Sequence, residues 1–133
     1  MASLFTKIIH GEIPCYKIAE NDLFFAFLDI EPLQQGHTLV VPKIEVDKWY
    51  KAEDKYLSEA LVFSKKIAQA IENAFSCIRC GISIIGLEVN HMHLHLVPIS
   101  NAQHLNFTQK PLAPTKSELL NAQTKLLDAY NKL

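Results

Sequence analysis

Apolar residues recur at two spacings along the chain, and each spacing predicts a different kind of element. Between residues 52 and 75 they recur every three or four positions, as at Leu57, Ala60 and Leu61, with lysine, glutamine and glutamate between them, which predicts a long amphipathic helix. Shorter apolar runs bounded by Asn, Asp, Gly or Pro predict five strands, at residues 16–20, 23–29, 37–42, 81–87 and 91–99.

Two further helices are expected near the ends of the chain. Residues 3–9 form a short apolar-patterned segment that Gly11 ends, and Thr115-x-x-Glu118 is a capping box before a C-terminal helix. Parallel strands would need a helix after nearly every strand, and only one long helix lies among these. The pattern therefore predicts an α+β fold over residues 1–133 as a single domain: a five-stranded antiparallel meander with the helices on one side, among them one long central helix and a C-terminal helix.

Charge and composition exclude several classes of function. Thirteen Lys and Arg against fourteen Asp and Glu leave a formal net charge of -1, which provides no broad field for a nucleic acid polymer or an anionic membrane. No run approaches the ~20 apolar residues of a membrane span, and the start lacks a signal-peptide pattern. The three cysteines are an odd count, which argues against a disulfide framework. We therefore expect a cytoplasmic protein.

Candidate chemistry gathers in one short run, where His91, His93 and His95 alternate with the apolar residues Met92 and Leu94. Alternate residues of a strand share a face, so the three imidazoles would lie on one face and the apolar side chains on the other. Three neighbouring rings would couple in their titration, an arrangement that stability alone does not favour.

This histidine run resembles the signature of the histidine triad (HIT) superfamily. Two upstream segments, residues 36–43 (Gly-His-Thr-Leu-Val-Val-Pro-Lys) and residues 5–14, resemble further segments of the family in the same order. The resemblance is greatest to the histidine triad nucleotide-binding branch, whose members are small homodimers that hydrolyse nucleoside phosphoramidates. It implies a phosphoramidase acting on purine nucleotide conjugates of the AMP or GMP type, without a cofactor or metal.

The resemblance also implies a role for individual residues. His93 would attack the α-phosphorus, the backbone carbonyl of His91 would hold the His93 ring, and His95 and His37 would face the phosphate and leaving group. Asp29 would bind the ribose hydroxyls. The other nucleotide-binding candidates surround the base and phosphate: Phe5, Ile8, Phe27, Ile30, Glu88 and Val89.

Some residues depart from the family pattern and keep other interpretations open. Leu87 stands where much of the family has glutamine, and Glu88 adds an acid near the expected phosphate, before a connection that we expect to be tight. One alternative is a nucleotide-binding or partner-binding protein without turnover, and another is a hydrolase whose three triad histidines bind zinc. The resemblance implies a dimer built on the long helix and one strand, and a stripe through Leu57, Leu61 and Ile67 is compatible with it.

Overall fold

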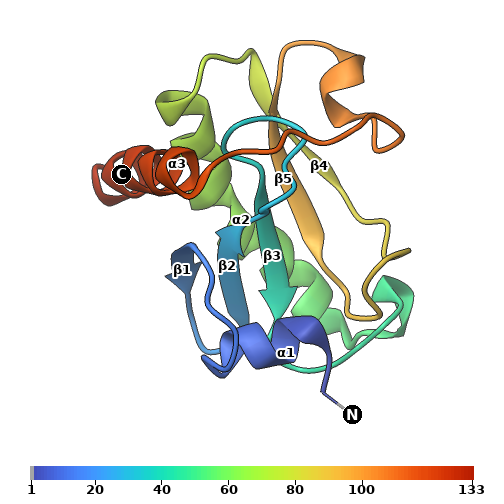
Figure 1. Ribbon diagram of the computed structural model, residues 1–133. Coiled ribbons are helices and arrows are strands. Elements are labelled where there is room, and N and C mark those ends of the chain that lie inside the picture. Colours follow the sequence, from blue (N-terminus) through green and yellow to red (C-terminus); the bar gives the residue numbers. More distant parts are fainter. Residues whose placement is uncertain (1) are drawn as a thin grey trace.

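The computed structural model describes residues 2–133, which form a five-stranded sheet with helices on both faces (Figure 1). All strand pairs are antiparallel, in the order β1-β2-β3-β5-β4, so the predicted antiparallel α+β fold is confirmed. The elements are α1 (Leu4–Ile9), β1 (Lys17–Glu20), β2 (Phe24–Leu28), β3 (Thr38–Pro42), the 3-10 helix η1 (Trp49–Lys51), α2 (Asp54–Ala74), β4 (Arg79–Ser83), β5 (Leu94–Ile99), the 3-10 helix η2 (Ala102–Leu105) and α3 (Lys116–Asn131).

The strand order departs from a simple meander at one connection. After β3 the chain passes through α2 to β4 at the edge of the sheet, and β5 then returns between β4 and β3. β4 begins at Arg79 and ends at Ser83, earlier than the expected range of 81–87. Residues 84–93 consequently form an irregular connection rather than a tight turn, because β5 begins only at Leu94.

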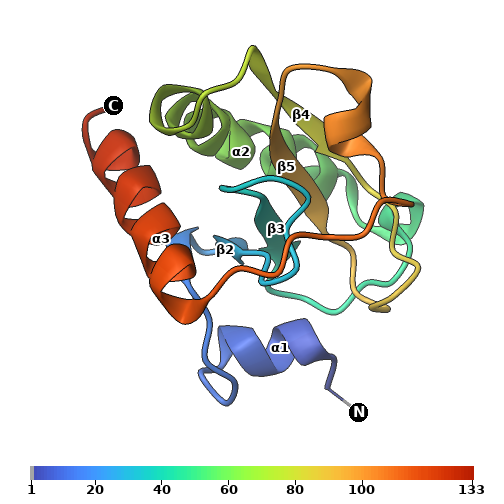
Figure 2. The ribbon, with the colours of Figure 1, turned by 45° about the horizontal axis from the view of Figure 1, so that its top comes forward.

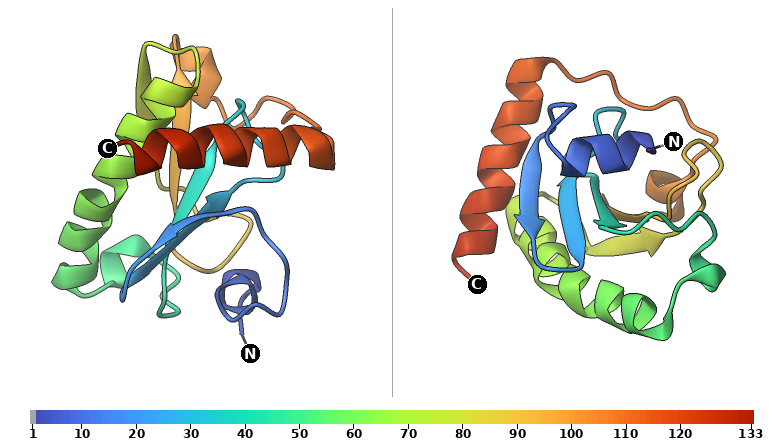
Figure 3. Two further views of the ribbon diagram at one scale, coloured as in Figure 1. Left: turned by 90° about the vertical axis from the view of Figure 1, so that its left-hand side faces the viewer. Right: turned by 90° about the horizontal axis from the view of Figure 1, so that it is seen from below.

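The two faces of the sheet are covered by different helices (Figure 3). Phe24, Ala26 and Leu28 of β2 belong to the core that α2 and α3 close, whereas Phe25 and Phe27 point to the opposite face. On that second face they pack with residues of α1. The expectation that the helices lie on one side is therefore wrong for α1, since its apolar residues need a partner that the other face of β2 supplies.

The long helix α2 buries one stripe of small and apolar side chains. Ala60, Ser64 and Ile67 are buried, and the Ser64 hydroxyl donates a hydrogen bond to the Ala60 carbonyl at 2.7 Å. Leu61 is 58% exposed while Ile67 is completely buried, so the aliphatic stripe suggested for a dimer contact is not exposed along its whole length. Nowhere in residues 2–133 is a helix both long enough and apolar enough to cross a bilayer.

The loop before β3 is held from two sides. The chain between η2 and α3 crosses the end of the sheet beside this loop (Figure 2). In that segment the Leu112 amide donates to the Pro32 carbonyl at 2.9 Å. Gly36 has a φ of +95°, and a Cβ there would lie 2.4 Å from the Phe75 ring. Only glycine fits this position. The next residue, His37, is held by its amide, which donates to the Gln34 carbonyl at 3.1 Å.

Candidate active site

The histidine run lies partly outside the strand that was predicted to contain it. Because β5 begins at Leu94, His91 and His93 precede the ladder and only His95 lies in it. The alternation nevertheless continues through the irregular segment: Met92 and Leu94 enter the α2 core, whereas the His91 and His93 rings contact Phe5 of α1 on the other face. The predicted division between a histidine face and an apolar face is confirmed.

His91 is completely buried, and both of its ring nitrogens are occupied. Nε2 lies 2.9 Å from the carbonyl oxygen of Pro42, which can only accept, so Nε2 carries the proton. Nδ1 lies 2.6 Å from the Ser3 hydroxyl and accepts its hydrogen. His91 is thus a bridge between β3 and the start of α1, and its ring offers no free nitrogen to a ligand.

His93 keeps one free nitrogen. Its Nδ1–H donates to the carbonyl oxygen of His91 at 2.7 Å, which leaves the lone pair of Nε2 without a partner in the described residues. The His93 ring packs edge-on against Phe5, with 4.9 Å between ring centroids, and only 6% of the residue is exposed. An oriented, neutral imidazole with a free Nε2 is a competent nucleophile.

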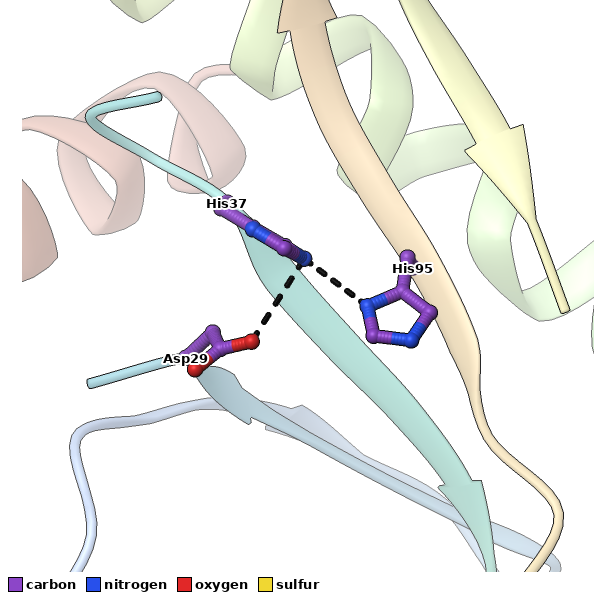
Figure 4. Close-up of side chains that lie close together, drawn as sticks. All are labelled: Asp29, His37 and His95. Carbon is purple, nitrogen blue, oxygen red and sulfur yellow. Dashed lines mark hydrogen bonds and ion pairs between the residues drawn. The ribbon is translucent and has the colours of Figure 1, made fainter. Parts of the chain in front are cut away.

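His37 and His95 form a hydrogen-bond chain that fixes both tautomers. The Leu33 amide donates to Nδ1 of His37 at 3.0 Å, so the proton of this ring lies on Nε2. That Nε2–H donates to Nδ1 of His95 at 2.9 Å (Figure 4). His95 must then carry its own proton on Nε2, where it is available as a donor next to His93, whose ring centroid is 4.8 Å away.

Burial keeps these rings uncharged at neutral pH. Burial first, and the neighbouring histidines second, lower the pKa of His37 to about 4 and that of His95 to about 3. Burial is also the main cause that lowers the pKa of His93. The site therefore offers hydrogen-bond donors and one nucleophilic nitrogen without a net positive charge.

Asp29 follows β2 and lies beside this chain. One carboxylate oxygen accepts from the Glu31 amide at 2.9 Å, and the other lies 3.6 Å from Nε2 of His37 (Figure 4). Burial raises the pKa of Asp29 to about 6, and this backbone hydrogen bond opposes the shift. The carboxylate remains mostly ionised at pH 7 and can accept from a ligand.

The hydrogen bonds oppose a metal site at either candidate position. Asp29, His37 and His95 each offer one atom, all within 4.8 Å of one another, but the proton on Nε2 of His37 occupies the nitrogen that would have to bind the metal. Within the triad itself, only Nε2 of His93 has a free lone pair. A zinc ion needs three or four such donors, so the zinc alternative would require these hydrogen bonds to break.

A cavity of about 400 Å³ opens in front of the histidines and brings the predicted binding residues together. Phe5 and Ile8 of α1 and Phe27 of β2 form a buried apolar wall, and Ile30 lies at the mouth with 61% exposure. The connection before the triad closes another side. All the predicted nucleotide-binding residues line this cavity: Asp29, Phe5, Ile8, Phe27, Ile30, Glu88 and Val89. His37, His93 and His95 also line it, whereas His91 lies behind.

Three residues of the site were not identified from the sequence. Ser3 caps α1 and bonds His91, and Glu45 accepts from both the Ser3 amide and the Thr6 hydroxyl. Phe107 packs its ring against His95, with 4.6 Å between centroids. A lone aromatic residue in a polar loop was the available signal for Phe107, whereas Ser3 had only the ordinary signal of a helix cap.

Comparison with known proteins gives a consistent result. A family model for the HIT domain matches residues 10–102. An uncharacterised HIT-like protein of Borreliella burgdorferi is 43% identical over 71% of this chain and 73% of its own length. The adenosine 5'-monophosphoramidase of Schizosaccharomyces pombe is 34% identical over 92% of this chain and 96% of its own length.

A solved structure extends the likeness over nearly the whole chain. A zinc-bound histidine triad family protein from Mycobacterium smegmatis has a TM-score of 0.85 and 27% sequence identity, and the match covers 99% of this chain and 95% of the other.

Proposed function

The chain belongs to the HIT family, and on that premise we propose that it hydrolyses nucleoside 5'-phosphoramidates or related AMP-type conjugates through a nucleotidyl intermediate on His93. The observation that carries the proposal is the free Nε2 of His93, held by the bond from Nδ1–H to the His91 carbonyl, at the edge of a cavity large enough for a nucleotide. The likeness to a monophosphoramidase over most of both chains supports this substrate class.

In the first step, the Nε2 lone pair of His93 attacks the α-phosphorus and forms a P–N bond. The bond from phosphorus to the leaving nitrogen breaks, and that nitrogen takes up a proton from solvent as it departs. The ring gains positive charge, which the His91 carbonyl oxygen stabilises through the proton on Nδ1. His95 donates its Nε2–H to a non-bridging phosphate oxygen, and His37 acts through His95 because its own N–H points at that ring.

In the second step, water attacks phosphorus and the Nε2 of His93 leaves with its electron pair. The water gives up a proton to solvent, which balances the proton taken up by the amine, and release of the nucleoside monophosphate restores the free enzyme. No other group changes its oxidation or protonation state. Two displacements at phosphorus, the first by the imidazole nitrogen and the second by water, replace one difficult direct attack by water.

Nucleotide binding divides between an apolar and a polar part of the cavity. Phe5, Ile8 and Phe27 offer flat, buried surface to a base, and the proposal places the ribose at the Asp29 carboxylate. A carboxylate that accepts from two vicinal hydroxyls favours ribose over deoxyribose. Val89 and Ile30 complete the walls, and Glu88 lines the cavity from the connection that precedes His93.

We also infer a symmetric dimer that pairs the free edge of β4 with that of a second copy. The edge carries Ile82, which is 44% exposed, and the neighbouring Ile78 and Ile84 are 64% and 37% exposed. An apolar, unpaired strand edge is a template for another strand. In sedimentation experiments the unchanged chain should behave as a dimer and the Ile82→Lys protein as a monomer. If the unchanged chain is a monomer, the inference is wrong.

The deciding experiment is turnover of an adenosine 5'-phosphoramidate with a fluorescent amine leaving group, with and without a chelator. We expect activity that survives the chelator, is abolished in His93→Ala and persists in the exposed control His10→Gln. Chelator-sensitive activity would favour the metal alternative. If the unchanged protein binds AMP but releases no amine, the chain is a nucleotide-binding protein and the proposal is wrong.

A further inference from the structure

The cavity that would receive an anionic phosphate has only acidic charged residues in its lining. Asp29, Glu31 and Glu88 line it, and no lysine or arginine is among the described residues that do so. Lys110, an exposed residue between the lining residues Gln109 and Pro111, is not part of the lining. A site for phosphate without a basic side chain and with several carboxylates is unusual, because phosphate sites normally supply positive charge.

The histidines do not compensate for this negative charge. His37, His93 and His95 all have a lowered pKa, so they are neutral at pH 7 and contribute donors only. Each additional negative charge on a substrate therefore meets repulsion that no group in the lining cancels. A nucleotide conjugate with a single negative charge on its phosphate enters most easily, and a positive charge elsewhere on it would be attracted.

Glu88 is the acidic lining residue nearest along the chain to His93, the proposed nucleophile. It lies in the connection that runs directly into His93, and its charge acts on both His93 and Asp29: it opposes the lowering of the His93 pKa and adds to the raising of the Asp29 pKa. It is exposed at the mouth, without an ion pair in the described residues, so its charge is free to act on a ligand. Asp29, by contrast, is assigned to the ribose and already accepts from the Glu31 amide.

We propose, resting on the function proposed above, that Glu88 selects nucleoside phosphoramidates whose leaving amine carries a second, protonated amino group, and disfavours polyphosphate and anionic leaving groups. The Glu88 carboxylate attracts the protonated amino group of the leaving amine both in the bound substrate and in the transition state, where the departing amine is still in the cavity. The product monophosphate is largely a dianion near pH 7. The same carboxylates then repel it, so the product should inhibit weakly.

Three substrates whose leaving amines share a four-atom backbone test the proposal: adenosine 5'-phosphoramidates of 1,2-diaminoethane, propylamine and β-alanine, with cationic, neutral and anionic leaving groups. We expect the unchanged protein to prefer the cationic over the anionic substrate in kcat/KM by about tenfold or more, since the two differ by two charges. Glu88→Gln should reduce that ratio by about three- to tenfold and should strengthen inhibition by AMP. Salt at 0.5 M, whose Debye length is only about 4 Å, should reduce the ratio as well.

Two controls locate the effect. Glu59→Gln, an exposed change on α2 outside the cavity, should leave the ratio of kcat/KM between the cationic and anionic substrates unchanged. Glu31→Gln, a change in the cavity lining, tests whether another lining acid affects this ratio as much as Glu88 does. A ratio near one in the unchanged protein, or a ratio that Glu88→Gln leaves intact, overturns the proposal while the phosphoramidase itself stands.

Binding separates this proposal from the proposed function. The His93→Ala protein lacks the nucleophile, so calorimetry can measure its affinity for the same three compounds without turnover. We expect the order cationic, neutral, anionic. Equal affinities contradict charge selection, whereas absence of turnover by the unchanged protein with this affinity order intact contradicts only the hydrolase.

Discussion

The hydrogen-bond chain from Leu33 through His37 to His95 makes the protonation of two rings a testable prediction. We consider His37→Gln and His37→Ala. The carbonyl oxygen of glutamine can accept from the Leu33 amide, and its N–H can donate to Nδ1 of His95, so both bonds can be retained. Alanine can make neither bond.

The structure sets the magnitude of the difference. His37 is 1% exposed and His95 is 8% exposed, so water replaces the lost partners poorly. A buried donor or acceptor left without a partner costs about 1–3 kcal/mol, and alanine leaves two such groups. The free energy of unfolding should therefore be about 2–6 kcal/mol lower for His37→Ala than for His37→Gln, a large part of the ~5–15 kcal/mol typical of a domain. The cavity left by the ring acts in the same direction.

Two assays examine the two parts of this reasoning. Urea unfolding of both variants gives the difference in free energy, and equal values would refute the energetic argument. 15N NMR of protein that contains 15N-labelled histidine reports which ring nitrogen is protonated. In the unchanged chain His37 and His95 should both carry the proton on Nε2, and neither should titrate between pH 5 and 8. A proton on Nδ1 of either ring, or titration near pH 6.5, would show that the chain of hydrogen bonds is not formed.

Four further predictions concern other parts of the site and fold. Gly36→Ala should lower stability by about 1–3 kcal/mol in thermal unfolding, because φ is +95° and the new Cβ would meet the Phe75 ring at 2.4 Å, and an unchanged midpoint would contradict this contact. Asp29→Asn should reduce kcat/KM for the ribonucleotide by about tenfold but barely change it for the 2'-deoxy analogue; an equal loss for both would argue against the ribose contact. Ser3→Ala should lower kcat by loosening His91, whereas Ser3→Thr keeps the hydroxyl and should restore it; if the threonine variant is as slow as alanine, the hydroxyl is not the cause. The free energy of unfolding should fall by about 1.4–2.7 kcal/mol per pH unit as the pH drops from 6 to 4.5. The unfolded chain takes up protons there on His37, His93 and His95, whose pKa values are lowered in the folded state, whereas the folded chain takes up one proton on Asp29, whose pKa is raised. A free energy of unfolding that does not change over this pH range would exclude these shifts.

The sequence predicts most of the elements because their patterns are local. The continuous buried apolar run of β2, the three- and four-residue spacing in α2 and the capping box at Thr115 each depend on residues within a few positions of one another. The order of β4 and β5 in the sheet, and the face that α1 covers, depend on contacts between distant segments. A strand pattern is the same whether the strand lies at an edge or inside the sheet, so neither feature was available from spacing.

The sequence likewise predicts which residues form the site, but not the chemical role of each one. The sequence shows three histidines at alternate positions, but it cannot distinguish them, because the proton on each ring is positioned by an atom from elsewhere in the fold. His91 is set by the Pro42 carbonyl and by a serine 88 residues away, His93 by a carbonyl two residues before it, and His95 by His37. Three identical side chains thus become a structural bridge, a nucleophile and a donor. Since neutral imidazole exchanges these roles when its proton moves, the surrounding acceptors and donors, rather than the triad spacing, determine which chemistry each ring can perform.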